Sequence, residues 1–337
     1  MTKIQVNPNF HVLTGKNILD KDDPAFREYR RKWEEWPLTF TVGEFPLHLD
    51  IEATCLCNLH CPFCATSYEP IGGRGFMSFK TFKKIIDEGV EYGLCAIKLN
   101  SGGRGEPMLN KSLPEMVAYA KRKGIMDVYF NTNATLLTRD IGIKLIQAGL
   151  DRISISLEGT NAEVYENYRV GASFKKVLKN IKEFIKLRDE MNAKKPLVRI
   201  QTVALPELQH ILGEYKEFWG NIVDEVAFID FKDYSHIQRD LIYDWACPYL
   251  WQRMMVRWDG TISVCQFDYS NSYKLGNVNN GDTIRSVWKG DIMEEIRELN
   301  KKGRSHEVEV CNGCSFRTTE ILKLMEGKYD DCSTSDR

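Results

Sequence analysis

Three cysteines in the first quarter of the chain could hold part of a metal cluster. They lie in the run Cys57-Asn-Leu-His60-Cys61-Pro-Phe-Cys64. A [4Fe–4S] cluster has four irons, normally all bound by cysteine thiolates, so three closely spaced cysteines would leave one iron open to another ligand. A zinc knuckle or buried structural thiols are the alternatives, but zinc prefers four ligands and His60 is the one nearby supplement. The spacing therefore predicts an iron–sulfur cluster at Cys57, Cys61 and Cys64.

A second set of cysteines lies near the C-terminus. Cys247 and Cys265 are separated by 17 residues, and Cys311 and Cys314 form a CxxC pair. A CxxC pair alone could be a redox pair, half of a zinc site or neither. Together the four thiolates make a complete ligand set, for which a zinc site with four cysteines is the main competitor. The set predicts a fully ligated metal site.

The first cysteine run resembles the signature of the radical S-adenosylmethionine (SAM) enzymes, CxxxCxxC with an aromatic residue, here Phe63, before the last cysteine. The resemblance implies a [4Fe–4S] cluster whose open iron binds the amino and carboxylate groups of SAM. It also implies that the reduced cluster splits SAM to a 5′-deoxyadenosyl radical, and that Phe63 lies near the adenine. Cys55 gives no pairing with the family spacing and is expected to be a bystander thiol.

Four further segments resemble the SAM-binding elements of this family. The loop from Asn100 to Pro107 is similar to the GGEP motif, with Arg104 in the place of its first glycine. The resemblance implies SAM contacts from Glu106, Asn133, Ser156 and Arg169. The alternatives are an exposed carboxylate in a glycine-rich turn, an asparagine that caps the following helix, and an arginine on the surface.

The C-terminal cysteines resemble the SPASM extension of radical SAM enzymes. Twelve residues separate Cys247 from Gly260 and four separate Gly260 from Cys265, before the CxxC pair. The later SPASM cysteines are missing, since Glu320 and Leu324 stand near their places. The shorter pattern is similar to the twitch form, as in 2-deoxy-scyllo-inosamine dehydrogenase. It implies one auxiliary [4Fe–4S] cluster held by Cys247, Cys265, Cys311 and Cys314, with a role in electron transfer.

Short apolar runs alternate with amphipathic helices along the chain, which predicts a parallel sheet covered by helices. The predicted strands are 47–52, 95–99, 126–130, 152–157, 197–203 and 225–231, and the predicted helices between them are 78–92, 113–123, 139–148, 174–192 and 206–219. This pattern agrees with the fold that the resemblance implies, an α/β partial (β/α)6 barrel. The first cysteine run then follows the first strand, at the edge where barrel enzymes place their chemistry.

Three regions are expected. Residues 1–45 form an N-terminal cover segment with one helix, capped by Asp22-Asp23-Pro24 and continuing to Trp36. Residues 46–235 form the radical SAM partial barrel. Residues 236–337 form a small auxiliary-cluster domain with a β-hairpin (254–257 and 261–264, Asp259-Gly260 turn) and a helix at 291–300.

Composition excludes some classes of protein. The chain has 337 residues, 43% of them hydrophobic, which is enough for a substantial core. With a formal net charge of −1 and no long basic run, it is not expected to bind nucleic acid. No apolar run approaches the roughly 18 residues of a membrane span, and the N-terminus lacks a signal peptide, so a cytoplasmic location is expected.

The function expected from the resemblance is hydrogen-atom abstraction from a small polar metabolite, most plausibly a sugar or cyclitol carbinol that is oxidised to a ketone. Asp230 is the candidate base, with a solvated loop carboxylate as the alternative. Rival hypotheses are an epimerase that uses Cys95 or Cys332 as hydrogen donor, a peptide-modifying enzyme, and a zinc scaffold without catalysis. A flavodoxin or ferredoxin is the reductant that the family implies.

Overall fold

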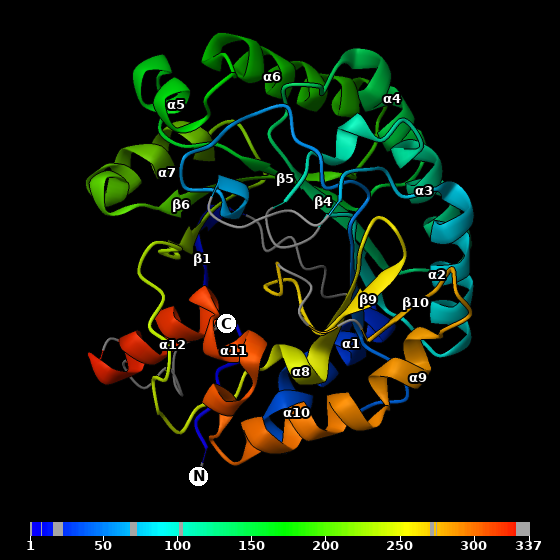
Figure 1. Cartoon of the computed structure of the whole chain (residues 1–337). Coiled ribbons are helices and arrows are strands. Elements are labelled where there is room, and N and C mark those ends of the chain that lie inside the picture. Colours follow the sequence, from blue (N-terminus) through cyan, green and yellow to red (C-terminus); the bar gives the residue numbers. More distant parts are fainter. Residues whose placement is uncertain are drawn as a thin grey trace.

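The computed structural model describes residues 2–7, 9–15, 23–67, 73–100, 104–269, 273 and 275–327. Cys332 and residues 101–103 of the glycine-rich loop lie outside the described residues. Six parallel strands form the centre of one sheet (Figure 1). In order along the chain they are β2 (His48–Ile51), β3 (Ala96–Lys98), β4 (Asp127–Thr132), β5 (Arg152–Ser156), β6 (Leu197–Ala204) and β7 (Glu225–Asp230). The predicted α/β partial barrel is confirmed.

Helices cover the outer face of these strands (Figure 1). They are α2 (Phe79–Glu91), α3 (Leu113–Arg122), α4 (Arg139–Gln147), α5 (Ala162–Tyr168), α6 (Phe174–Glu190) and α7 (Leu212–Gly220). The alternate strand residues Val128, Phe130 and Ile153 are fully buried in the core that joins sheet and helices. Because successive strand residues point to opposite faces, the other half of each strand faces the barrel lumen.

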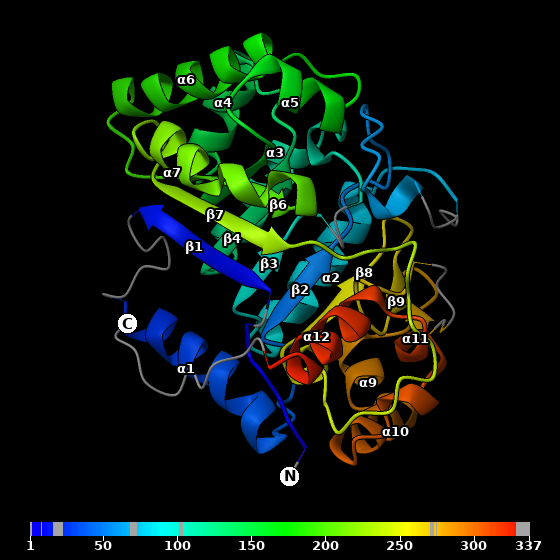
Figure 2. The same ribbon diagram turned by 90° about the vertical axis from the view of Figure 1, so that its left-hand side faces the viewer.

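The N-terminal region contributes a strand as well as a helix. β1 (Phe10–Gly15) lies antiparallel to β7 and ends the sheet on that side (Figure 2). The strand was not predicted, because a six-residue edge strand gives only a weak periodic signal. The predicted helix is α1 (Pro24–Thr39), in which Pro24 occupies the first turn and the Asp23 carboxylate accepts a hydrogen bond from the Ala25 amide at 2.8 Å.

The C-terminal region extends the same sheet at its other end. β8 (Arg253–Val256) lies parallel to β2 and is followed by antiparallel β9 (Thr261–Ser263) and β10 (Gly276–Asn277). The predicted hairpin turn is present, and Gly260 has a φ of +88° that favours glycine. One continuous sheet therefore runs through the barrel and the C-terminal region.

Short helices surround this hairpin (Figure 2). They are α8 (Tyr249–Gln252), α9 (Ile284–Trp288), α10 (Asp291–Lys301), α11 (Glu309–Asn312) and α12 (Ser315–Met325). Of these, α10 was predicted. Short 3₁₀ turns occur at η1 (Ala65–Ser67), η2 (Pro107–Leu109), η3 (Pro206–Ile211) and η4 (Ser305–Glu307), so that η3 replaces the first part of the predicted helix 206–219. Among the described residues, no helix is long and apolar enough to cross a lipid bilayer.

Candidate active site

The barrel lumen holds a cavity of about 630 Å³ that polar and aromatic side chains line together. Tyr129 and Asn131 of β4, Arg152 and Ser156 of β5 and Gln201 of β6 line it, each next to an apolar residue that points outward. Phe63 and Cys64 line the same cavity from the first cysteine run. The lumen therefore joins the cysteine loop to the polar faces of the strands.

The loop that carries Cys57, Cys61 and Cys64 follows β2. Backbone hydrogen bonds hold it, from the His60 amide to the Val170 carbonyl at 3.0 Å and from the Cys64 amide to the Cys61 carbonyl at 3.1 Å. Burial raises the pKa of the Cys57 thiol to about 11 and also raises that of Cys61, and both are further raised by neighbouring cysteines of the run. The three sulfurs are thus close enough to interact electrostatically.

No group of three His, Cys, Asp or Glu side chains in the described ranges converges on one point that a single metal ion could occupy. The ligands of a [4Fe–4S] cluster bind different irons and need not converge on one point. Three neighbouring thiols beside the lumen fit such a cluster by the chemistry of their sulfur donors.

Arg169 lies beside this loop at the end of α5. Its guanidinium makes a two-pronged ion pair with the fully buried Glu158, with one contact at 2.8 Å, and its third nitrogen donates to the Cys61 sulfur at 3.6 Å. It also lies 5.2 Å from the centre of the Phe63 ring. The Arg169 side chain is only 12% exposed, so it belongs to the lumen and is not a surface charge. With Phe63 and Ser156 it lines the lumen.

Glu106 and Asn133 lie together on the other side of the cysteine loop. The Glu106 carboxylate is buried and accepts hydrogen bonds from the Thr132 hydroxyl at 2.8 Å and from the Asn133 and Met108 amides at 2.8 and 3.1 Å. Burial raises its pKa, and these hydrogen bonds oppose the rise. Glu106 is thus a buried carboxylate, and the alternative of an exposed carboxylate in a glycine-rich turn is wrong.

The Asn133 side chain faces the cysteine loop. It donates to the Asn58 side chain at 3.0 Å and to the Cys57 sulfur at 3.9 Å. The cap of the following helix α4 is Thr138, whose hydroxyl accepts from the Ile141 amide at 3.4 Å. Asn133 therefore does not cap that helix, and its amide connects β4 with the first cysteine run.

The four C-terminal cysteines come together from different elements. Cys247 precedes α8, Cys265 follows β9, Cys311 lies in α11 and Cys314 caps α12. Burial raises the pKa of all four thiols. Charge repulsion from other cysteines of the set further raises the pKa of Cys247, Cys265 and Cys311. A set of four soft sulfur donors, one buried and three partly buried, fits a metal cluster that is fully ligated by protein.

Two further cysteines lie away from both sets. The buried Cys55 thiol faces the carbonyls of Gly73 and Gly75, at 3.7 and 4.0 Å. The Cys95 thiol donates to the Gly93 carbonyl at 3.4 Å, and Cys95 packs against a cluster that includes Trp33. The contacts of Cys55 and Cys95 are therefore those of cysteines with a structural role.

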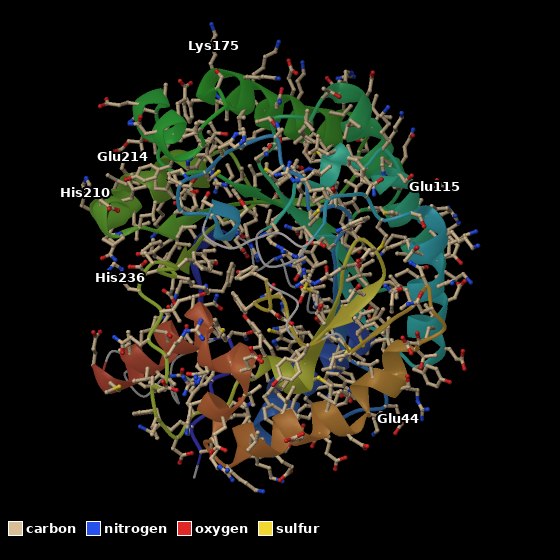
Figure 3. All side chains as sticks on the ribbon, viewed as in Figure 1. Glu44, Glu115, Lys175, His210, Glu214 and His236 are labelled. Atoms are coloured by element: carbon tan, nitrogen blue, oxygen red, sulfur yellow. The ribbon has the colours of Figure 1, made fainter. Side chains whose placement is uncertain are left out.

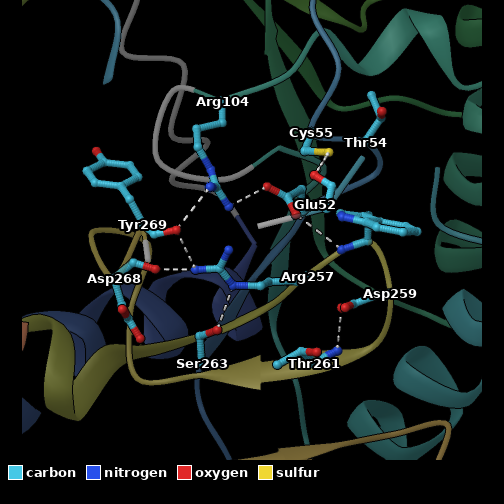
Figure 4. Close-up of polar contacts among 12 residues, drawn as sticks. Glu52, Thr54, Cys55, Arg104, Arg257, Asp259, Thr261, Ser263, Asp268 and Tyr269 are labelled. Atoms are coloured by element: carbon cyan, nitrogen blue, oxygen red, sulfur yellow. Dashed lines mark hydrogen bonds and ion pairs between the residues drawn. The ribbon is translucent and has the colours of Figure 1, made fainter. Parts of the chain in front are cut away.

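A network of buried charges links the barrel to the C-terminal hairpin (Figure 4). Glu52 follows β2 and pairs with Arg104 at 2.9 Å, while its second oxygen accepts from the Trp258 amide at 3.2 Å. Arg104 also donates to the carbonyl of Tyr269 at 3.4 Å, and Arg257 donates to the Ser263 hydroxyl at 2.9 Å. Arg104, which replaces a glycine of the GGEP motif, thus binds the two regions together.

Asp230, the candidate base, lies at the end of β7 and is held by His11 and Lys323. Its carboxylate pairs with His11 at 3.1 Å and with Lys323. Ile229 and Lys232 line the lumen on either side of it, but Asp230 is not among the lining residues. The Asp230 carboxylate therefore connects the end of β7 with β1 and α12 and is not directed into the lumen.

The lumen contains charged residues that the sequence reasoning did not select. They are Arg30, Lys98, Arg152, Arg199, Glu225, Lys232 and Arg253. Alternation of charged and apolar residues, as in Arg152-Ile-Ser-Ile-Ser156, is the signal that could have revealed them. Such alternation shows that a strand has one polar face, but not whether that face meets solvent or a cavity.

Comparisons with known proteins match both regions. Residues 51–194 match the family model of the Radical SAM superfamily, and residues 247–315 match SPASM, an iron–sulfur cluster-binding domain. The chain is 34% identical over 137 residues to a probable GTP 3′,8-cyclase of Methanococcus maripaludis, an alignment that covers 41% of this chain. The chain spans only 45% of the length of that relative.

Solved structures share the fold. BtrN in complex with AdoMet and 2-DOIA matches with a TM-score of 0.55 and 18% identity, over 81% of this chain and 94% of that one. Native anSMEcpe with bound AdoMet and Cp18Cys peptide matches with a TM-score of 0.59 and 16% identity, over 83% of this chain and 95% of that one. At these identities the likeness concerns the fold.

Proposed function

This chain belongs to the radical SAM superfamily and carries a SPASM iron–sulfur domain, and on that premise we propose that it oxidises a small polar metabolite by hydrogen-atom abstraction. Membership of the two families implies a SAM-binding [4Fe–4S] cluster and an auxiliary iron–sulfur cluster. We assign Cys57, Cys61 and Cys64 to the first. We assign the second to Cys247, Cys265, Cys311 and Cys314.

When bound, SAM and the two clusters supply a 5′-deoxyadenosyl radical that takes the carbinol hydrogen and an acceptor for the electron left behind. The chain itself supplies the enclosure and the polar contacts. Phe63 and Arg169 line the lumen beside Cys64, and Glu106 and Asn133 lie against the same loop. We propose that these residues and Ser156 surround SAM. A flavodoxin or ferredoxin as reductant is proposed on the family resemblance alone.

The observation that carries this proposal is the continuity of the lumen from Cys64 to the polar strand faces. A cavity of about 630 Å³ that begins at the cluster loop is in the size range of small-molecule sites. Among the described residues, Cys64 is the single thiol that lines it. That favours oxidation over epimerisation, since a hydrogen donor from another cysteine would have to come from outside these residues.

The test is turnover of the anaerobically reconstituted enzyme with SAM, dithionite and a panel of small polar metabolites in deuterated water. The proposal expects 5′-deoxyadenosine in step with a product that has lost two hydrogens. Deuterium at carbon without net oxidation would instead indicate an epimerase. Coupled turnover with peptides alone would replace the small-molecule proposal.

A further inference from the structure

Five arginines line the lumen, and four of them bind a carboxylate. The fifth, Arg30, lies over the rings of Tyr29 and Trp33, at 5.6 and 5.3 Å. Arg152 binds Asp127 through two nitrogens, at 2.9 and 2.5 Å, and Arg253 binds Asp50 at 3.1 Å. Arg199 pairs with Glu225, and Arg169 pairs with Glu158 as described above. These four positive charges are therefore balanced within the protein.

Lys232 also lies among groups of both signs. Its ammonium is 3.5 Å from the Asp230 carbonyl and lies over the rings of Phe267 and Phe316, at 5.9 and 5.8 Å. The charges that act on it are attractive from Glu320 and Asp230 and repulsive from Lys323. Its surroundings thus compensate its charge in part.

Lys98 lacks such compensation. It is the last residue of β3, it lines the lumen, and no ion pair or hydrogen bond to its ammonium is found in the described part of the chain. Asp50, the acid whose charge acts on it, is already bound by Arg253. Burial lowers the pKa of Lys98 to about 8, and Arg253, Arg152 and Lys232 lower it further against the opposing effect of Asp50.

The partly buried Lys98 ammonium lies beside the ion pairs of Arg152 and Arg253 without a carboxylate of its own, and so leaves positive charge in the cavity. A bound anion would neutralise it in a region where charge interactions are stronger than in water. We propose that Lys98 binds an anionic oxygen group of the substrate, a carboxylate or a phosphate. The inference rests on the proposed function in taking the lumen as the substrate site, and it makes the substrate an acid or a phosphate ester rather than a neutral or cationic sugar.

The test measures the modification of Lys98 in the reconstituted holoenzyme. The rate of reductive methylation of each lysine is followed by peptide mass spectrometry with added inorganic phosphate or acetate, against chloride at equal ionic strength. Lys175, on the exposed surface of α6, is the internal standard (Figure 3). At ten times the dissociation constant of the anion, labelling of Lys98 is expected to slow about tenfold while that of Lys175 does not change. Protection of Lys98 by acetate would indicate a carboxylate on the substrate, and protection by inorganic phosphate would indicate a phosphate group.

A matched pair of variants gives a second readout. At ten times the dissociation constant the same anion should raise the apparent Tm of the wild-type holoenzyme by about 2 °C. Lys98→Met should lose this shift, and Lys175→Met should keep it. The inference is overturned if neither anion changes the labelling of Lys98, or if Lys98→Met keeps the full shift.

Failure of the proposed function would look different. Wild-type enzyme with SAM and dithionite that forms no 5′-deoxyadenosine, with or without added metabolites, would contradict the proposed function whatever the anions do. Formation of 5′-deoxyadenosine without any anion effect would contradict only the role of Lys98.

Discussion

Arg104 and Glu52 form an ion pair of 2.9 Å whose side chains are only 2% and 0% exposed to solvent. Glu52 follows the first barrel strand, Arg104 lies in the loop after the second, and both also bind backbone groups of the C-terminal region, at Tyr269 and Trp258. The pair therefore lies where the loops that we propose bind SAM meet the hairpin of the SPASM domain (Figure 4).

Loss of one partner of this pair should destabilise the protein strongly. Arg104→Met leaves the Glu52 carboxylate buried without its guanidinium, which typically reduces the free energy of unfolding by about 3–5 kcal/mol. Urea unfolding of the reconstituted protein, followed by circular dichroism, measures the loss. The double variant Glu52→Gln with Arg104→Met should recover part of it, because no buried charge remains.

The matched control is the exposed ion pair between Arg31 and Glu28 on α1, with side chains 56% and 46% exposed. Arg31→Met should leave the free energy of unfolding nearly unchanged, because water screens an exposed ion pair. Equal effects of the Arg104 and Arg31 substitutions would show that burial of the Arg104 pair does not matter.

Removal of one C-terminal cysteine should remove one cluster only. We expect about eight irons per reconstituted wild-type chain and about four for Cys265→Ala, since each [4Fe–4S] cluster holds four irons. Iron analysis and the visible absorption near 400 nm are the measurements. Cys95→Ala is the control, because that thiol bonds a backbone carbonyl away from both cysteine sets. A wild-type chain with fewer than about seven irons would contradict the two-cluster assignment.

Lys98 should become reactive towards an amine reagent at a lower pH than an ordinary lysine does. Its pKa of about 8 means that the amine is largely neutral above pH 8, whereas an ordinary lysine stays protonated up to about pH 10. Labelling of wild-type protein at several pH values should give a midpoint near 8 for Lys98. A midpoint for Lys98 equal to that of Lys175 would contradict the prediction.

Asp230 should stabilise the fold at neutral pH and less in acid. Burial would raise the pKa of its carboxyl, but hydrogen bonds from His11 and Lys323 outweigh burial and leave it lowered. Its contribution is therefore present above the unfolded value of about 3.9 and is lost as the pH falls through the lower folded value. Asp230→Asn should reduce the free energy of unfolding at pH 7 by about 2 kcal/mol.

The measurement is chemical unfolding of wild type and Asp230→Asn at a series of pH values. The difference between the two should shrink as the pH falls below about 4. A constant difference down to pH 2 would mean that the carboxylate does not carry the effect.

Much of this architecture was readable in the sequence because its signals are local. Apolar runs located the six barrel strands β2 to β7, and Asp23 with Pro24 located the start of α1. The spacing of Cys57, Cys61 and Cys64 indicated cluster chemistry before any fold was known. These patterns depend on residues a few positions apart, where helix and strand periods and ligand spacing operate.

Only the tertiary structure decided which charges share the lumen and which are balanced. Lys98 is unpaired because Arg253, more than 150 residues later, holds Asp50, and Arg104 is paired because the turn after β3 meets Glu52 after β2. Asp230 looked like a base at a strand end until β1 and α12 brought His11 and Lys323 to it. The ion pairing and the pKa of a side chain depend on all the groups around it in space. Many of these groups are far away in the sequence, so the sequence alone does not identify them.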